Sequence, residues 1–141
     1  MSEIKHRYVE SNGIRMHAAE CGQGFPVLLC HGFPELWYSW RHQLGALGDA
    51  GFRAIAPDQR GYGETDAPAA VSDYTIHHLV GDLTGLLDAL EIEKAVILAP
   101  KTAPPAKVAQ LLIFGATVIL VDGTYELFRN HFGAPPKKAP E

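Results

Sequence analysis

Residues 26–44 read PVLLCHGFPELWYSWRHQL, and this stretch decides the fold. Its first five residues are a continuous apolar run, which predicts a strand buried on both faces of a mostly parallel sheet. Gly32 and Pro34 then favour a tight turn. Beyond the turn, apolar residues recur at spacings of three and four from Trp37 to Leu47, which predicts an amphipathic helix. The stretch is therefore the strand, turn and helix of a βαβ unit.

The same alternation continues toward the C-terminus. Short apolar runs predict three further strands, at 52–56, 95–99 and 117–121. Periodic apolar positions predict a helix over 76–90, with Thr75 as its N-cap, and another helix over 102–115. Because crossovers between parallel strands are right-handed, these units are expected to form one sheet with helices on its faces.

A β-hairpin is predicted before the first βαβ unit, because the segments 4–10 and 14–20 flank Asn12-Gly13, a hairpin-turn dipeptide. The predicted fold class is α/β: a three-layer sandwich in which an N-terminal β-hairpin is followed by βαβαβαβ. Residues 1–124 are expected to form a single domain, and 125–141 a C-terminal tail.

Composition excludes several classes of protein. The 141 residues are 47% hydrophobic and 20% charged, which is ordinary for a globular chain. The net charge of -4 argues against a nucleic-acid partner. No apolar run approaches the ~20 residues that span a bilayer, so no membrane partner is expected. The N-terminus has no secretory pattern, so Cys21 and Cys30 are expected to be free thiols in a cytoplasmic protein.

A candidate site is expected at the carboxyl edge of the parallel strands, where crevices form in such sheets. Three segments reach this edge: 31–40, 57–68 and the chain after 95–99. In the first, His31-Gly32-Phe33-Pro34 could present the Phe33 N–H as an oxyanion donor. The alternative is a tight structural turn with Trp37 and Trp40 in the core.

The second segment and the other histidines are open to simpler interpretations. Asp58 and Arg60 could form a pair that braces the crevice wall, or the simpler interpretation, a structural turn with an ion pair, could apply. His77 and His78 are adjacent on the predicted helix and are not spaced to bind one metal ion. His17 and His42 are isolated in the sequence. No metal or cofactor site is predicted.

Three motifs together resemble an α/β-hydrolase. They are HGFPELWYSWRHQL at 31–44, PDQRGYGETDAP at 57–68 and YTIHHLVGDLTGLLDAL at 74–90, in the order and spacing of that family's N-terminal half. Residues 1–97 are most similar to the epoxide hydrolases, with the haloalkane dehalogenases next. The resemblance implies a truncated α/β-hydrolase sheet. It also implies an oxyanion-hole N–H at Phe33 and a place beside the substrate for Trp37.

The third segment departs from that family. Its members carry a nucleophile elbow, Gly-x-Asp-x-Gly or Gly-x-Ser-x-Gly, directly after a strand. Without gaps, Lys101 falls at the nucleophile position, and Ala99 and Ala103 replace the two glycines. An ammonium cannot form the ester intermediate that a carboxylate forms with an epoxide. The family's acid, histidine base and lid tyrosines would lie beyond residue 141. No catalytic residue is therefore identified, and 31–34 with Trp37 form a vestigial oxyanion and substrate loop.

The segment after residue 97 resembles a different family. PKTAPPAKVAQLLIFGATVILVDGTYE at 100–126 is similar to threonine synthase and related fold-type II pyridoxal-phosphate enzymes, over about 97–124. The resemblance brings no cofactor chemistry, because the Schiff-base lysine motif and the phosphate-binding glycine loop are missing. We do not expect Lys101 or Lys107 to act as a Schiff-base lysine. Net charge changes from -6 over 1–97 to +2 over 98–141.

Three hypotheses follow. The first is a folded, catalytically inactive α/β domain, chimeric or engineered, derived from an epoxide hydrolase-like protein. The second is a minimal hydrolase acting on epoxides or esters, which requires a histidine within hydrogen-bond reach of an Asp, Ser or Cys at the strand ends. The third is an oligomerising module: the apolar strand 117–121 would lie at a sheet edge, so a homodimer or larger oligomer is expected through 103–121.

Overall fold

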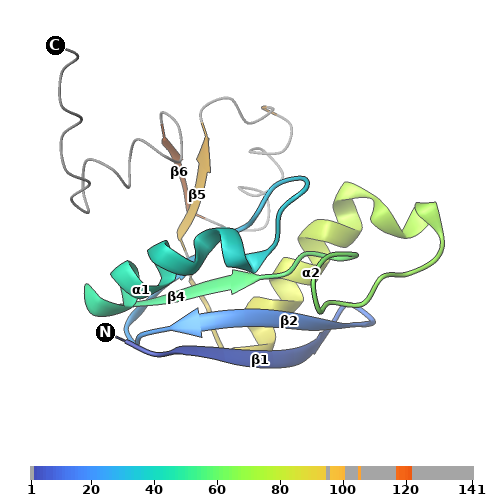
Figure 1. The fold of residues 1–141 in the computed structure, drawn as a ribbon. Coiled ribbons are helices and arrows are strands. Elements are labelled where there is room, and N and C mark those ends of the chain that lie inside the picture. Colours follow the sequence, from blue (N-terminus) through green and yellow to red (C-terminus); the bar gives the residue numbers. More distant parts are fainter. Residues whose placement is uncertain (1, 95, 101–104, 106–116, 122–141) are drawn as a thin grey trace, which may run out of the picture.

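The structure is a computed structural model that describes residues 2–94, 96–100, 105 and 117–121. It contains a six-stranded sheet in the order β1-β2-β4-β3-β5-β6 (Figure 1). β1 and β2 pair antiparallel, as do β2 and β4, whereas the pairs among β3, β4, β5 and β6 are parallel. The predicted order, a hairpin followed by a mostly parallel sheet, is confirmed.

The hairpin consists of β1 (Ile4–Ser11) and β2 (Ile14–Cys21). Its turn has positive φ angles at both central residues, 49° at Asn12 and 76° at Gly13. Asn and Gly tolerate this backbone region and it matches the twist of the strands, so the dipeptide fixes the register, in which Ser11 faces Ile14. The predicted hairpin is confirmed.

The parallel part of the sheet contains four strands, β3 (Phe25–Leu28), β4 (Phe52–Pro57), β5 (Val96–Pro100) and β6 (Thr117–Val121). Each lies within a residue or two of its predicted range. β3 is central, with β4 on one side and β5 on the other. Leu28 is in register with both Ile55 and Ile97, so these three strands point the same way at the same level.

The helix predicted from Trp37 is only partly correct. Trp37–Trp40 form a 3-10 helix, η1, and the α-helix α1 begins at Arg41 and ends at Asp49. The second helix agrees better: α2 spans Ile76–Ala89 after a short 3-10 helix, η2 (Val71–Tyr74). The predicted N-cap is confirmed, because the Thr75 side chain accepts a hydrogen bond from the His78 N–H.

Two hydrophobic clusters cover the two faces of the sheet. Alternate residues of a strand point to opposite faces, and Ala54 and Ala56 of β4 belong to one cluster, with Leu44 and Leu47 of α1. Ile55 belongs to the other cluster, with α2 residues such as Leu86. The sheet therefore lies between α1 and α2, as a three-layer sandwich requires (Figure 1).

Several predictions fall on residues that are not described. They are the helix over 102–115 apart from Pro105, the nucleophile position Lys101, and the tail 125–141. In the part of the chain that is described, no helix is long and apolar enough to cross a membrane.

Candidate functional site

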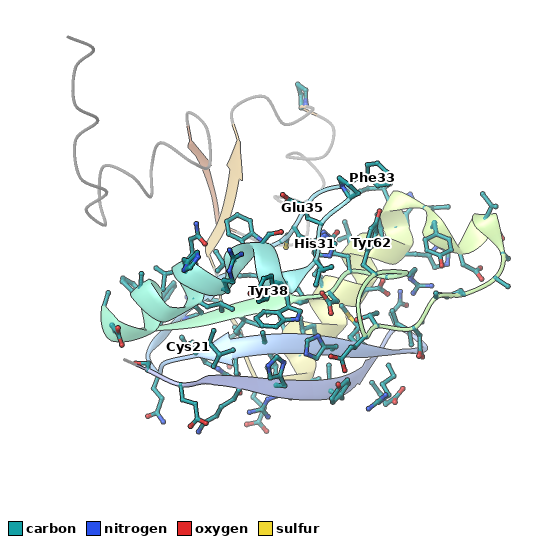
Figure 2. The ribbon with its side chains drawn as sticks, in the orientation of Figure 1. Cys21, His31, Phe33, Glu35, Tyr38 and Tyr62 are labelled. Carbon is teal, nitrogen blue, oxygen red and sulfur yellow. The ribbon has the colours of Figure 1, made fainter. Side chains whose placement is uncertain are left out.

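The loop after β3 is anchored by a buried histidine. His31 is 4% exposed, and its Nε2 accepts a hydrogen bond from the Gln59 backbone N–H at 3.0 Å. Nδ1 must therefore carry the proton, and it donates to the Gly32 carbonyl at 2.9 Å. The Gln59 side-chain amide donates to the His31 carbonyl, and the Tyr62 ring lies edge-on 5.0 Å from the imidazole (Figure 2). His31 thus ties this loop to the loop after β4.

The next residues turn outward. The Phe33–Pro34 peptide bond is cis, and the Glu35 N–H donates to the Gly32 carbonyl at 2.9 Å to close a turn. The Phe33 side chain is 86% exposed and points away from the sheet (Figure 2). Trp37 is half-buried and packs against the cluster on the α1 face. The predicted residues therefore lie in one short segment at the carboxyl edge: His31, Gly32, Phe33 and Pro34 on the loop after β3, and Trp37 at the start of η1.

Asp58 connects this loop to the rest of the sheet. It follows β4 directly and is fully buried. Its Oδ1 accepts the Trp37 N–H at 2.8 Å, and its Oδ2 accepts the Glu64 N–H at 3.1 Å. Oδ2 also accepts from the His17 Nδ1 at 2.7 Å. One carboxylate therefore fixes the loop after β3, the loop after β4 and the middle of β2.

His17 is isolated in the sequence but not in space. It lies in β2 with its side chain fully buried, and its Nε2 is 2.9 Å from the His6 Nδ1 on β1. A histidine thus lies within hydrogen-bond reach of an aspartate at a strand end, as the minimal-hydrolase hypothesis requires. However, both partners are buried, and the second nitrogen of His17 already faces His6, so the pair does not present a base to solvent. His17 and Asp58 are 41 residues apart in the sequence, so no local sequence pattern could predict this pair.

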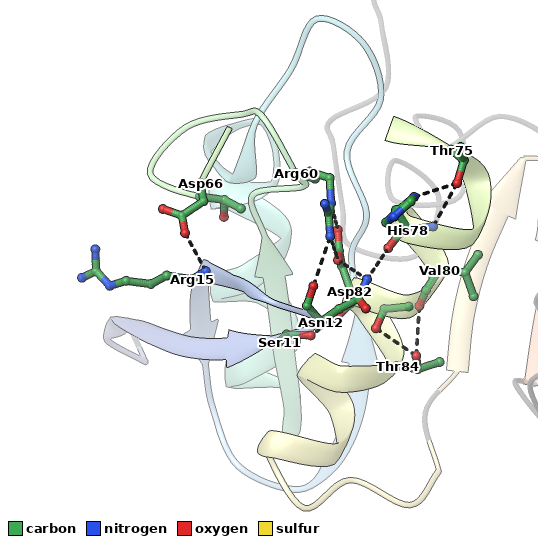
Figure 3. A network of polar contacts seen from close by, with 12 residues as sticks. Ser11, Asn12, Arg15, Arg60, Asp66, Thr75, His78, Val80, Asp82 and Thr84 are labelled. Atoms are coloured by element: carbon green, nitrogen blue, oxygen red, sulfur yellow. Dashed lines mark hydrogen bonds and ion pairs between the residues drawn. The ribbon is translucent and has the colours of Figure 1, made fainter. Parts of the chain in front are cut away.

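The expected pairing of Asp58 with Arg60 is wrong. Arg60 pairs instead with Asp82 of α2, with Nη2–Oδ1 at 2.6 Å and Nε–Oδ2 at 2.8 Å (Figure 3). The hydrogen bonds that Arg60 donates to Asp82 raise the pKa of Arg60. Asn12 completes the network, because its Nδ2 donates to Asp82 Oδ1 at 2.9 Å and its carbonyl accepts from Arg60 Nη2 at 3.4 Å. This network fastens the hairpin turn and the loop after β4 to α2.

The nucleophile position lies outside the described residues, but the strand that leads to it is described. β5 ends at Pro100, one residue before Lys101, and runs parallel to β3, with Val96 in register with Val27. The chain therefore leaves β5 at the same edge at which the 31–37 loop leaves β3. This is the position from which a nucleophile elbow would face that loop.

Other reactive groups are few. Burial raises the pKa of the Cys30 thiol to about 12, so Cys30 is not an activated nucleophile. Burial likewise raises the pKa of Cys21. Among the described residues, no group of three or more His, Cys, Asp or Glu side chains could hold a metal ion. His78 instead completes the helix cap, with its Nδ1 2.8 Å from Thr75 Oγ1.

A pocket of about 780 Å³ lies at the opposite, amino edge of these strands. Arg7 and Arg53 line it and bind the two carboxylate oxygens of Glu20, at 2.6 Å and 3.0 Å. Burial favours a higher pKa for Glu20, but the hydrogen bonds from the two arginines outweigh it and hold the pKa below its usual value. This pocket lies at the other edge of the strands and shares none of the residues of the 31–37 loop, so it is separate from the candidate site.

The comparisons with known proteins agree with this geometry. The family model described as alpha/beta hydrolase fold matches residues 26–99, which include α1, β4, α2 and most of β3 and β5. The chain therefore belongs to the α/β hydrolase fold family, as the motifs predicted.

Within this family the chain is similar to epoxide hydrolases. It is 60% identical over 97 residues to epoxide hydrolase 3 of Siraitia grosvenorii, covering 69% of this chain and 31% of that protein. It is 55% identical over 98 residues to epoxide hydrolase A of Mycobacterium tuberculosis, covering 68% and 30%. A solved Vigna radiata epoxide hydrolase mutant superimposes with a TM-score of 0.74 at 50% identity, over 82% of this chain and 36% of that one. The chain thus spans less than a third of the length of these two curated relatives.

Proposed function

We propose that this chain is an epoxide hydrolase-like α/β domain that keeps the substrate-side loop but has lost the nucleophile, and that it does not hydrolyse epoxides or esters by itself. The proposal rests on the residue that follows the end of β5. This strand brings the chain to the edge beside the 31–37 loop, and the residue that follows is Lys101 rather than an aspartate. An ammonium group cannot open an epoxide to form an ester intermediate.

The retained half of the site supports the same proposal. His31, Asp58 and Gln59 hold the loop through backbone hydrogen bonds that do not depend on a nucleophile. We infer that Phe33 keeps the place of an oxyanion donor and Trp37 the place of a substrate-side wall. The chain can therefore fold as a hydrolase domain and still lack turnover. The buried His17–Asp58 pair does not restore it, because neither side chain reaches solvent.

The test is an assay of the purified chain with an aromatic epoxide and with a nitrophenyl ester. We expect product to form at the rate of the blank for both substrates. Lys101→Ala is the matched variant, because it removes the residue at the nucleophile position without adding a nucleophile. Turnover clearly above the blank, lost in Lys101→Ala or in Trp37→Ala, would show an active minimal hydrolase and overturn the proposal.

We also propose that the chain is a chimera, of natural or engineered origin. Its support is the length of the sequence matches: the family model stops at residue 99, and the curated relatives cited above align over 97 or 98 residues, whereas the solved Vigna radiata mutant aligns structurally over 82% of the chain. The segment 97–124 carries the threonine synthase-like pattern, and net charge changes sign at the same place. The test is to align this segment alone with both families. A higher similarity to the nucleophile strand and helix of epoxide hydrolases than to fold-type II enzymes would contradict a chimeric origin.

Self-association is a second candidate function. β6 lies at one end of the strand order, and its sequence TVILV is apolar, which favours edge pairing with another copy. We propose a homodimer or larger oligomer through 103–121. Light scattering at micromolar concentration tests this, and a monomeric mass would contradict it. Two free thiols, Cys21 and Cys30, fit a reducing compartment, so a cytoplasmic location is proposed with it.

A further inference from the structure

Three side chains form a hydrogen-bonded chain from the protein surface to the candidate site. His6, on the edge strand β1, is exposed, whereas His17 and Asp58 are fully buried. The His6 Nδ1 lies 2.9 Å from the His17 Nε2, and the His17 Nδ1 lies 2.7 Å from Asp58 Oδ2. The two imidazole rings are stacked, with centroids 5.1 Å apart and planes at 13°.

The positions of the protons follow from the partners. A carboxylate only accepts hydrogen bonds, so the His17 Nδ1 carries a proton and donates it to Asp58. When His17 is neutral, its Nε2 is an acceptor and the His6 Nδ1 donates to it. A proton added to the outer nitrogen of His6, Nε2, leaves both hydrogen bonds, His6–His17 and His17–Asp58, intact. A second proton must bind the His17 Nε2, where it would face the N–H of a charged His6 at 2.9 Å.

The state with two protons is therefore incompatible with the observed contact. Two donors would point at each other, and two like charges would lie about 5 Å apart in stacked rings. The contact between His6 and His17 can form when both imidazoles are neutral and when one of them carries an added proton. With two, His6 must move away from His17, and His6 is free to do so because it lies on an exposed edge strand.

The 31–37 loop contacts two of the three hydrogen-bonded side chains, Asp58 and His6, through Trp37. The Trp37 N–H donates to the Asp58 carboxylate that also accepts from His17. The Trp37 ring meets the His6 ring edge-on, with centroids 4.9 Å apart and planes at 79°. On the remaining side, the Tyr8 ring lies 5.2 Å from His17. Movement of His6 would therefore remove the ring that contacts Trp37 edge-on.

The charged groups around the histidine pair are few. Asp58 faces His17 from the end of β4. Tyr8 on β1 donates a hydrogen bond to Glu64 of the loop after β4, and the Arg15 guanidinium of β2 lies 4.0 Å from the Tyr8 ring centroid. Glu64 and Arg15 offset each other across Tyr8, so among the described residues Asp58 is the one unbalanced charge that contacts the pair directly.

We propose that His6 and His17 form a proton-operated latch on the loop that carries Trp37. The latch is closed while the pair holds at most one added proton, and it opens when both imidazoles are charged. Opening separates His6 from the Trp37 ring and exposes the side of the ring that His6 covers. The inference does not rest on the proposed function, because it requires no catalysis.

Long-range 1H–15N correlation spectra of the uniformly 15N-labelled chain test the latch between pH 8 and pH 5. These spectra report which nitrogen of each imidazole carries a proton. At pH 8 we expect the proton of His17 on Nδ1. As the pH falls, the pair should take up one proton with the Trp37 amide signal unchanged. The Trp37 amide signal should move when the second proton binds and both imidazoles are charged.

His6→Gln is the decisive variant. A glutamine amide can donate to the His17 Nε2, or accept from it, without taking a proton itself. The Trp37 amide signal should then stay unchanged between pH 8 and pH 5, because a neutral glutamine can accept a hydrogen bond from a protonated His17 Nε2 and no second charge separates the two side chains. His42→Gln, at an exposed position in α1, is the matched control and should leave the Trp37 transition unaltered.

Two results would overturn the latch. One is a His17 with its proton on Nε2 at pH 8, because the chain to Asp58 would then be broken. The other is a Trp37 amide transition that persists in His6→Gln, because the two-charge clash cannot form in that variant. If His6→Gln does not fold, His6→Asn provides the same comparison with a shorter side chain.

Discussion

The Arg60 guanidinium and the Asp82 carboxylate form a buried two-point ion pair, with side chains only 4% and 2% exposed. Arg60 belongs to the loop after β4, and Asp82 lies in the middle of α2. The pair also takes in Asn12 of the hairpin turn (Figure 3). Three segments that are 22 to 70 residues apart in the sequence are thus fastened at one point.

Asp82→Asn should destabilise the fold strongly. The substitution keeps the size of the side chain but leaves the buried Arg60 charge without a counter-ion, which costs about 3–5 kcal/mol. We expect urea unfolding to show this loss in the free energy of unfolding. Asp88→Asn, on the exposed side of the same helix, is the control and should change stability by less than about 0.5 kcal/mol. Equal effects of the two substitutions would contradict the role of the pair.

Gly63 should tolerate alanine far less than two other glycines of the same region. Its φ is 51°, and a Cβ at this position would lie 2.1 Å from Asp58 Oδ2. Gly63→Ala should therefore displace Asp58 and cost about 2–4 kcal/mol. Thermal unfolding of the variant measures this loss.

Gly13 and Gly32 are the matched controls for Gly63. Both have open space where the Cβ of an alanine would lie, but Gly13 has a φ of 76°. Gly13→Ala should cost about 1 kcal/mol from the backbone alone. Gly32→Ala should be nearly neutral, within about 0.5 kcal/mol. A loss for Gly63→Ala no larger than that for Gly13→Ala would show that Asp58 can yield without cost.

Features that depend on neighbouring residues could be predicted from the sequence. The Asn12-Gly13 turn, the cap at Thr75 and the strand at 117–121 each rest on a short pattern, and the structure contains all three. The start of α1 could not be predicted in this way. The aromatic spacing from Trp37 fits a helix, but the Trp37 N–H is held by Asp58, and a 3-10 turn forms before Arg41.

The interior of the candidate site could not be predicted, because its partners are far apart in the sequence. Proximity in the sequence favours a pair between Asp58 and Arg60, although strand pairing brings His17 beside Asp58 instead. Register explains this: β2 pairs antiparallel with β4, so that Ala18 faces Pro57 and the adjacent His17 reaches the residue after the strand. Such a contact depends on which strands are neighbours and on the register in which they pair. The local sequence patterns predict the class of the sheet but not these details.

Glu20 should contribute stability that depends on pH. Burial opposes its charged form, but the hydrogen bonds from Arg7 and Arg53 prevail and lower the pKa of Glu20 in the folded protein. A lowered folded pKa means that the contribution is complete above the usual glutamate pKa, and that it is lost as the pH falls through the folded value.

Glu20→Gln should therefore reduce the free energy of unfolding at pH 7 by about 1 kcal/mol, a modest value because Arg7 is half exposed. The difference from the unaltered protein should disappear as the pH falls below the usual glutamate pKa and through the lowered folded value. Urea titrations at about pH 7, 4.5, 3.5 and 2.5 measure it. Glu10→Gln, on the exposed face of β1, is the control. A Glu20→Gln deficit that persists unchanged at the lowest pH would contradict the pairing.

Cys30 should react as a shielded thiol. Burial raises its pKa to about 12, and alkylation proceeds through the thiolate, so the rate should be low at pH 7. In a Cys21→Ala background, the rate of iodoacetamide modification should rise about tenfold per pH unit up to at least pH 10. An unfolded cysteine instead levels off above about pH 9, where its thiol is mostly ionised. The same variant in concentrated urea is the control, and mass spectrometry follows both reactions. A plateau near pH 9 in the folded protein would mean that Cys30 reacts from an open state, and the strand end beside the 31–37 loop would then be less closely packed than the structure indicates.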